Sequence, residues 1–127
     1  MKLSLIAESQ DAYIDTEWDA DRSYVKFRWV IPGYESPSAT DGDLDGVVCS
    51  LNLERLPDDY FWVDGVHTDG GYQGLGYATK LYRHALSNLQ GAGYKGIKSS
   101  HSIRNDNSNA LWKKLGGRSD DFYNYLE

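Results

Sequence analysis

A change of hydrophobic period across a glycine-rich turn constrains the fold of this chain more than any other feature. An apolar run from Tyr60 leads to Thr68, and the turn that follows reads Asp69-Gly70-Gly71-Tyr72-Gln73-Gly74-Leu75-Gly76. Beyond it, apolar residues recur at the three- and four-residue spacing of an amphipathic helix, at Leu75, Ala78, Leu81, Tyr82, Ala85, Leu86 and Leu89. A strand, a glycine turn and a helix start in this order leave backbone N–H groups available to an anion such as a phosphate.

The residues before the turn alternate between apolar and polar side chains, which predicts strands. A polar loop over Ser36–Gly46 interrupts them, and Asp19–Ser23 is suited to a hairpin connection. The four predicted strands are Asp11–Trp18, Tyr24–Val30, Gly46–Glu54 and Tyr60–Thr68.

After the first helix, Gly91-Ala92-Gly93 is a typical C-terminal stop. The following segments predict a strand over Tyr94–Ile103, a helix over Asn105–Leu115 that ends at Gly116-Gly117, and a closing strand over Asp121–Leu126. The order β-β-β-β-α-β-α-β predicts a mixed sheet with helices packed on it, in the α/β (α+β) class. A length of 127 residues predicts one domain over 1–127.

Composition indicates the cellular compartment of the protein. The apolar runs are too short for a membrane span, and the run at the N-terminus is too short for a signal peptide. Cys49 is the only cysteine, so an intrachain disulfide is excluded and a reducing compartment is indicated. We therefore expect a cytoplasmic protein without membrane association.

Charge is unevenly distributed along the chain. Residues 1–65 hold fourteen acidic and five basic residues, a net charge of −9, whereas residues 66–127 hold five acidic and eight basic residues, a net charge of +3. The basic half suits a phosphate-bearing ligand and the acidic half a cationic partner, although the acids could simply solvate the loops. Asp41–Gly46 lacks the terminal glutamate of a calcium loop, so we expect no metal site.

Two segments resemble motifs of the GNAT superfamily of N-acetyltransferases. Val66–Gly76 resembles the acetyl-CoA motif, an apolar strand followed by Arg/Gln-x-x-Gly-x-Gly/Ala at the start of a helix. Asn105–Gly117 is similar to the second motif, Asn-x-x-Ala-x-x-Leu-Tyr-x-Lys-x-Gly-Phe. The resemblance implies a mixed, mostly antiparallel sheet with a splay between the fourth and fifth strands, and acetyl-CoA as acyl donor.

The resemblance also implies which residues bind the donor. Pantetheine would pair with Val66 and Thr68, Asn105 would bond its arm, and N–H groups of Gly71–Gly76 would hold the diphosphate. An N–H near Val66 would polarise the thioester carbonyl. The implied acetyl-CoA site comprises Val66, His67, Thr68, Gly71, Tyr72, Gln73, Gly74, Leu75, Gly76, Tyr77, Asn105 and Trp112.

Three positions depart from the motifs. Gly71 stands where the family has Arg or Gln, so only its N–H can reach a phosphate. Trp112 stands where many members have a tyrosine that serves as general acid, and an indole N–H is no usable acid. Gly117 replaces the usual phenylalanine.

The implied activity is acetyl transfer to a primary amine: a small amine, a lysine side chain or a protein N-terminus. The general base is open among Asp64, Glu54 and His67, and each of these residues could instead be a solvated surface group. A non-catalytic binding or inhibitory protein on the same scaffold is the alternative, and a homodimer is left open. The mixed charge and the glycine turn argue against a nucleic-acid mimic or partner.

Overall fold

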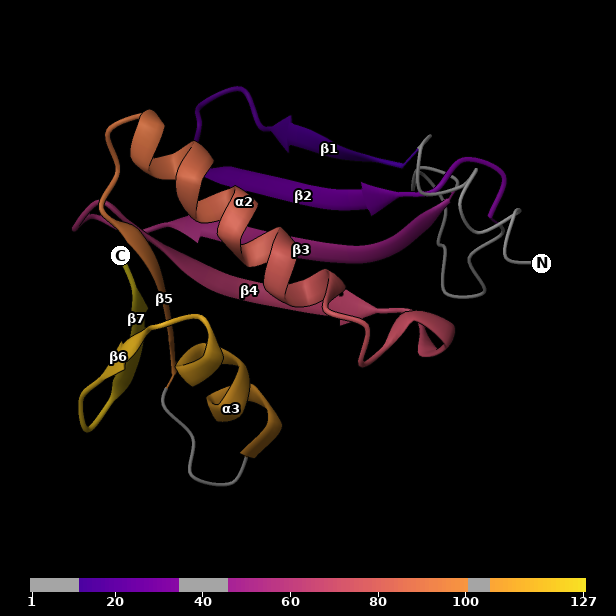
Figure 1. The fold of residues 1–127 in the computed structure, drawn as a ribbon. Coiled ribbons are helices and arrows are strands. Elements are labelled where there is room, and N and C mark those ends of the chain that lie inside the picture. Colours follow the sequence, from indigo (N-terminus) through magenta and orange to yellow (C-terminus); the bar gives the residue numbers. More distant parts are fainter. Residues whose placement is uncertain (1–11, 35–45, 101–105) are drawn as a thin grey trace.

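The computed structural model describes residues 12–34, 46–100 and 106–127, without the side chains of 106–109. Its strands form one sheet in the order β1-β2-β3-β4-β5-β7-β6 (Figure 1). The strands are β1 (Tyr13–Trp18), β2 (Tyr24–Val30), β3 (Val47–Arg55), β4 (Tyr60–Thr68), β5 (Gly96–Ser100), β6 (Arg118–Ser119) and β7 (Tyr123–Leu126). A short 3-10 helix η1 (Gly70–Tyr72) precedes the helices α2 (Tyr77–Gly91) and α3 (Asp106–Lys114).

The sheet is antiparallel except where β4 meets β5. Among the described residues, Tyr60–Trp62 of β4 pair in parallel with Gly96–Lys98 of β5. Helix α2 is the crossover that connects the two strands. Beyond Trp62, β5 turns away from β4, as Figure 1 shows, and β5 continues the sheet by pairing with β7. The mixed, mostly antiparallel sheet and the splay between the fourth and fifth strands are therefore confirmed.

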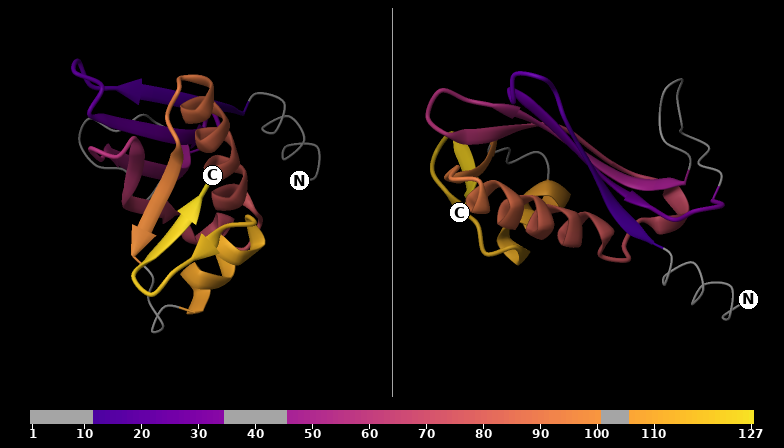
Figure 2. Two further views of the ribbon diagram at one scale, coloured as in Figure 1. Left: turned by 90° about the vertical axis from the view of Figure 1, so that its left-hand side faces the viewer. Right: turned by 90° about the horizontal axis from the view of Figure 1, so that it is seen from above.

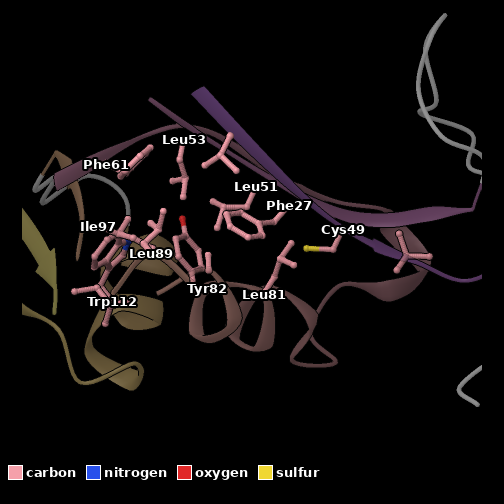
Figure 3. Close-up of a cluster of buried hydrophobic side chains, with 14 of the residues drawn as sticks. Phe27, Cys49, Leu51, Leu53, Phe61, Leu81, Tyr82, Leu89, Ile97 and Trp112 are labelled. Carbon is pink, nitrogen blue, oxygen red and sulfur yellow. The ribbon is translucent and has the colours of Figure 1, made fainter. Parts of the chain in front are cut away.

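Both α-helices lie on the same side of the sheet (Figure 2). Helix α2 buries Leu81, Tyr82, Ala85 and Leu89, the spacing that the sequence predicts for its apolar face. These side chains pack on β2, β3 and β4. Figure 3 shows Leu81, Tyr82 and Leu89 against four fully buried sheet residues, namely Phe27, Leu51, Leu53 and Phe61. The odd-numbered residues of β2 and β3 thus face α2.

Strands β2 and β4 have the predicted bounds, β3 is shifted by one residue, the other predicted elements are shorter, and one strand was not predicted. The expected strand Tyr94–Ile103 is β5, which covers only Gly96–Ser100 of the described residues. Strand β6 was missed because two residues are too few to show a period; Asp120 makes its hairpin by accepting hydrogen bonds from the N–H groups of Phe122 and Tyr123. Most of the Ser36–Gly46 loop, with Asp41–Asp45, lies outside the described residues.

No helix in the described part of the chain is long and apolar enough to cross a bilayer.

Candidate functional site

The glycine turn is attached to the end of β4 through a buried carboxylate. Asp69 is 2% exposed, its N–H donates to the carbonyl oxygen of Val48, and one carboxylate oxygen accepts a hydrogen bond from the Tyr34 hydroxyl at 3.1 Å. The other oxygen lies 3.0 Å from Nε2 of His67. A buried carboxylate needs such partners, and here they fix the direction in which the chain leaves the strand.

Further contacts hold the turn itself. The Gln73 side chain donates to the carbonyl oxygen of Thr68 at 3.0 Å. The ring of Tyr72 lies between two others, with centroids 5.0 Å from Tyr34 and 5.5 Å from Tyr77 in edge-to-face geometry. The turn between β4 and α2 is therefore held by side chains at both ends.

The backbone of the turn is open toward the start of α2. Gly74 and Gly76 have φ angles of +76° and +87°, which side chains disfavour, and an added Cβ at either would find no atom within 4 Å. Gly76 caps α2 without a side-chain hydrogen bond, and the first turn of the helix holds no acidic residue. The first N–H groups of a helix have no partner within the helix, so those of α2 and the positive end of its dipole lie at this open side of the turn.

That space is a cavity of about 460 Å³ between the end of β4, the start of α2 and α3. Five of the residues implied for acetyl-CoA line it: Thr68, Tyr72, Gly74, Gly76 and Tyr77. The remaining lining residues are Ala78, Thr79, Ala110, Leu111 and Lys114. Its volume and its mixture of apolar walls with few polar groups are those of a ligand pocket.

The other implied donor-binding residues lie elsewhere. Leu75 and Val66 are exposed by 61% and 46%, outside the lining of the cavity. Gly71 and Gln73 are exposed parts of the turn, and His67 contacts Asp69. Trp112 is 2% exposed, its ring centroid lies 5.6 Å from that of Tyr82, and it belongs to the core cluster that Figure 3 shows. Asn105 lies outside the described residues.

A β-bulge determines where Asp64 lies. Asn52 of β3 pairs with Gly65, but Leu53 pairs with Val63, so Asp64 is an extra residue on β4. The Tyr24 hydroxyl donates a hydrogen bond to the Asp64 carboxylate. Burial, together with this hydrogen bond, raises the pKa of Tyr24 to about 12.

The base candidates share one face of the sheet. Tyr24, Glu54 and Trp62 pair in one row across β2, β3 and β4, and the even-numbered residues of β2 and β3 point away from α2. Asp64 lies on this face because Tyr24 reaches it, and His67 lies on it because it pairs with Ser50. The structure brings Glu54 and Asp64 to the same tyrosine and leaves His67 three residues farther along β4.

The splayed edge of β4 separates two chemically different regions. On the α2 side are the glycine turn and the cavity, which suit an anionic ligand with an extended arm. On the other side are two carboxylates and the Trp62 ring, whose centroid lies 6.0 Å from that of Tyr123. A group that passes between β4 and β5 would meet carboxylates that can accept a proton.

Sequence reasoning missed three residues at this site. Asp69 could have been found from its place between a strand and Gly-Gly, where an acid commonly fixes a turn. Tyr24 gives no local signal, because it reaches the site from an element distant in sequence, whereas Lys114 stands at the lysine position of the second motif.

The sequence matches the model of the acetyltransferase (GNAT) family over residues 5–117. No protein of curated function matches it. Among solved structures, one described as a streptothricin acetyltransferase from Bacillus anthracis, in complex with acetyl coenzyme A, superimposes with a TM-score of 0.66 at 13% identity. That match covers 83% of this chain but only 62% of the other.

Two further structures have the same fold at 14% identity. The ribosomal-protein-S18-alanine N-acetyltransferase from Escherichia coli gives a TM-score of 0.62 and covers 98% of this chain and 85% of its own. The IAA acetyltransferase from Bacillus cereus gives 0.64, with 87% and 79% covered. At such identities the likeness is one of fold, and function must be argued from the site.

Proposed function

The chain belongs to the acetyltransferase (GNAT) family, and from this premise we propose that it transfers an acetyl group from acetyl-CoA to a primary amine. The observation that carries the proposal is the cavity of about 460 Å³ into which the glycine turn and the start of α2 open, beside the splay of β4 and β5. Acetyl-CoA supplies an activated acyl group and an anionic handle by which it can be held.

On the donor side, the N–H groups from Gly71 to Gly76 and of the first turn of α2 would bind the diphosphate. The edge of β4 at Val66 and Thr68, which pairs with no described residue of β5, would bond the pantetheine arm as an added strand does. Asn105 keeps the role in binding that arm which the family resemblance implies. Trp112 would support the helix from the core, since it is 2% exposed.

In the reaction, the amine nitrogen forms a bond to the acetyl carbon, the carbon–sulfur bond breaks, and coenzyme A leaves as its thiol. An ammonium acceptor must first lose one proton, for which Asp64 is our first choice of base. Asp64 lies at the bulge beside the splay of β4 and β5. Glu54 lies on the same face but pairs with Trp62, two residues before Asp64, and His67 contacts the buried Asp69. The Tyr24 hydroxyl would position the carboxylate.

The acceptor would be cationic. Asp64 and Glu54 lie on the face away from α2, and the Trp62 ring on the same face can attract an ammonium group. Whether this amine belongs to a small molecule, a lysine or a protein N-terminus is an outcome of the assays below. The lone Cys49, buried and without a disulfide, supports the expected cytoplasmic location.

Calorimetry with coenzyme A and acetyl-CoA, followed by thiol release in the presence of a panel of amines, tests the proposal. Gly74→Trp should abolish binding, because it fills the open side of the turn at a positive φ while leaving the core untouched. Circular dichroism would show whether that variant is folded. Unchanged affinity in a folded Gly74→Trp protein would contradict the placement of the diphosphate.

The base is tested by a matched pair of variants. Asp64→Asn should lower turnover more than it lowers acetyl-CoA affinity and should remove the acidic limb of the pH–rate profile, whereas Glu54→Gln should leave that limb in place. An unaltered profile in Asp64→Asn would transfer the role to another residue.

One observation favours a second candidate, a binding or inhibitory protein on this scaffold. The position of the family's tyrosine acid holds Trp112, which lies in the core, so no hydroxyl reaches the cavity from there. Stabilisation of the protein by coenzyme A without turnover of any amine would support this alternative.

A further inference from the structure

A glycine leaves a gap on the face of the sheet where the base candidates lie. Gly65 of β4 pairs with Asn52 of β3, and the positions of such a cross-strand pair share one face. The gap is therefore on the face away from α2, next to Asp64, with Trp62 and His67 on either side of it along β4. Apart from chain neighbours, the only described atom within 4 Å of a Cβ built at Gly65 is Nδ2 of Asn52, at 3.6 Å.

The amide beside this gap makes no hydrogen bond to any described residue. Oδ1 of Asn52 is shielded from solvent and has no partner there, and Nδ2 has none either. A shielded oxygen without a donor lowers stability, and native proteins keep few of them. The two ends of the amide exchange places by a half turn about the Cβ–Cγ bond, and here that turn breaks no hydrogen bond. Oδ1 can therefore be presented to the gap over Gly65.

We propose that Oδ1 of Asn52 accepts a hydrogen bond from the acceptor amine and holds its nitrogen in the gap over Gly65, beside the carboxylate of Asp64. The inference rests on the proposed acetyl transfer and adds an acceptor-binding residue to it. Strand β4 pairs with described residues of β5 only as far as Trp62, so the gap lies where the two strands have separated. A primary ammonium group has three N–H donors, so one can face Asp64 while another faces Asn52.

The contact with Asn52 selects for primary amines. After its proton has passed to Asp64, a primary amine retains two N–H groups, and its amide product still has one, so the bond to Asn52 persists through the reaction. An N-methyl amine retains a single N–H group and loses it on acetylation. A site built on a hydrogen bond discriminates strongly against analogues that lack the donor. We therefore expect the enzyme to prefer a primary amine over its N-methyl derivative.

Steady-state kinetics compare the wild type with Asn52→Leu, Asn52→Asp and the control Ser50→Ala, which lies on the same face of β3. The probes are a short diamine, a lysine-containing peptide and a peptide with a free N-terminus, each with its N-methyl derivative. With the best primary amine, kcat/KM should fall about tenfold in Asn52→Leu and change less than about threefold in Asn52→Asp, which keeps an acceptor oxygen, and in Ser50→Ala. The preference over the N-methyl derivative should shrink in Asn52→Leu, and the Kd of acetyl-CoA should stay within about twofold throughout. An unchanged kcat/KM in Asn52→Leu would overturn the inference.

Thermal unfolding of the same variants separates a role in amine binding from a structural one. Asn52→Leu exchanges an unpaired, shielded amide for an apolar side chain of similar size, so its Tm should hold or rise while its turnover falls. A Tm that falls while kcat/KM is unchanged would show that the amide serves the fold, for example by binding a buried water, and would overturn the inference.

Filling the gap tests whether it receives the amine. Gly65→Ala places a methyl group at an ordinary contact distance from Asn52, so the variant should fold as the wild type does. Its kcat/KM for the amine should fall about tenfold or more, with the Kd of acetyl-CoA unchanged. Full turnover in a folded Gly65→Ala protein would contradict the placement. If the wild type acetylates no amine, the proposed function fails and this inference with it; if it does and Asn52→Leu and Gly65→Ala both match it, only this inference fails.

Discussion

Replacing Trp112 tests whether its indole belongs to the core or to a ligand site. The residue is 2% exposed, and its ring meets that of Tyr82 edge to face at 5.6 Å. A Cβ added at Gly117 would lie 3.3 Å from the indole ring, so the ring is enclosed from that side too. Since the cavity is lined by Leu111 and Lys114 from the same helix but not by Trp112, we expect its loss to affect stability and not binding.

The expected loss of unfolding free energy follows from the burial of the Trp112 side chain. Truncation of a buried Trp to Ala costs about 3–5 kcal/mol, and Trp112→Phe removes three ring atoms, which at ~0.8 kcal/mol per buried carbon amounts to about 2 kcal/mol. An unfolding entropy of about 2.1 cal/mol/K per residue gives roughly 0.27 kcal/mol/K for 127 residues. The Tm should therefore fall by about 7 °C in Trp112→Phe and about 15 °C in Trp112→Ala.

Urea unfolding and calorimetry with coenzyme A, on the same Trp112→Phe preparation, measure the two effects separately. We expect an unchanged denaturant slope, a lower midpoint, and a Kd within about twofold of the wild type. An unfolding free energy within about 0.5 kcal/mol of the wild type, together with a Kd weakened tenfold, would refute the assignment of this indole to the core.

Three further predictions concern the sheet. Gly96→Ala should prevent or severely weaken folding, seen as lost thermal cooperativity, because its Cβ would lie 2.0 Å from a backbone carbonyl oxygen of β7; an unchanged Tm would contradict this. Burial and the hydrogen bond to Asp64 raise the pKa of Tyr24 to about 12, and the pKa should fall in Asp64→Asn but stay above 10 because the burial remains; carbon-13 NMR of labelled tyrosine measures it. Because the folded pKa is the higher one, the stabilisation is complete below pH 10 and is lost as the pH rises toward 12. The hydrogen bond from Arg28 lowers the pKa of Glu17 below 4.5, so stability present above pH 4.5 is lost as the pH falls through the folded value, and Glu17→Gln should flatten the dependence of Tm on pH between 3 and 6.

The sequence allowed prediction of the elements whose signal is local. Helix α2 was predictable because Leu81, Tyr82, Ala85 and Leu89 repeat at helical spacing, and its start because glycines precede it. The turn was recognised for the same reason, and Gly74 and Gly76 indeed have positive φ. The boundaries of β5 were less predictable, since tertiary pairing with β7, not composition, determines where that strand ends.

Contacts between distant segments were beyond prediction. Nothing near Tyr24 indicates that its hydroxyl reaches Asp64 forty residues later. Trp112 is a motif position that the resemblance assigns to the donor site, and the structure buries it in the core; helical periodicity alone cannot tell which of two adjacent residues faces a cavity.

The bulge at Asp64 explains how one strand can supply both sides of the site. In a strictly alternating strand, Val63, Gly65 and His67 would share the face toward α2, and Thr68 would point away from the cavity. The extra residue reverses this order, so that Thr68 pairs with Cys49 on the α2 side, where their side chains lie 3.3 Å apart, and His67 turns to the opposite face. Asp64 is left on that opposite face at the point of reversal, bonded to Tyr24. A single inserted residue therefore directs Thr68 into the cavity and a carboxylate to the opposite face of the sheet, the separation that the proposed acyl transfer between two ligands requires.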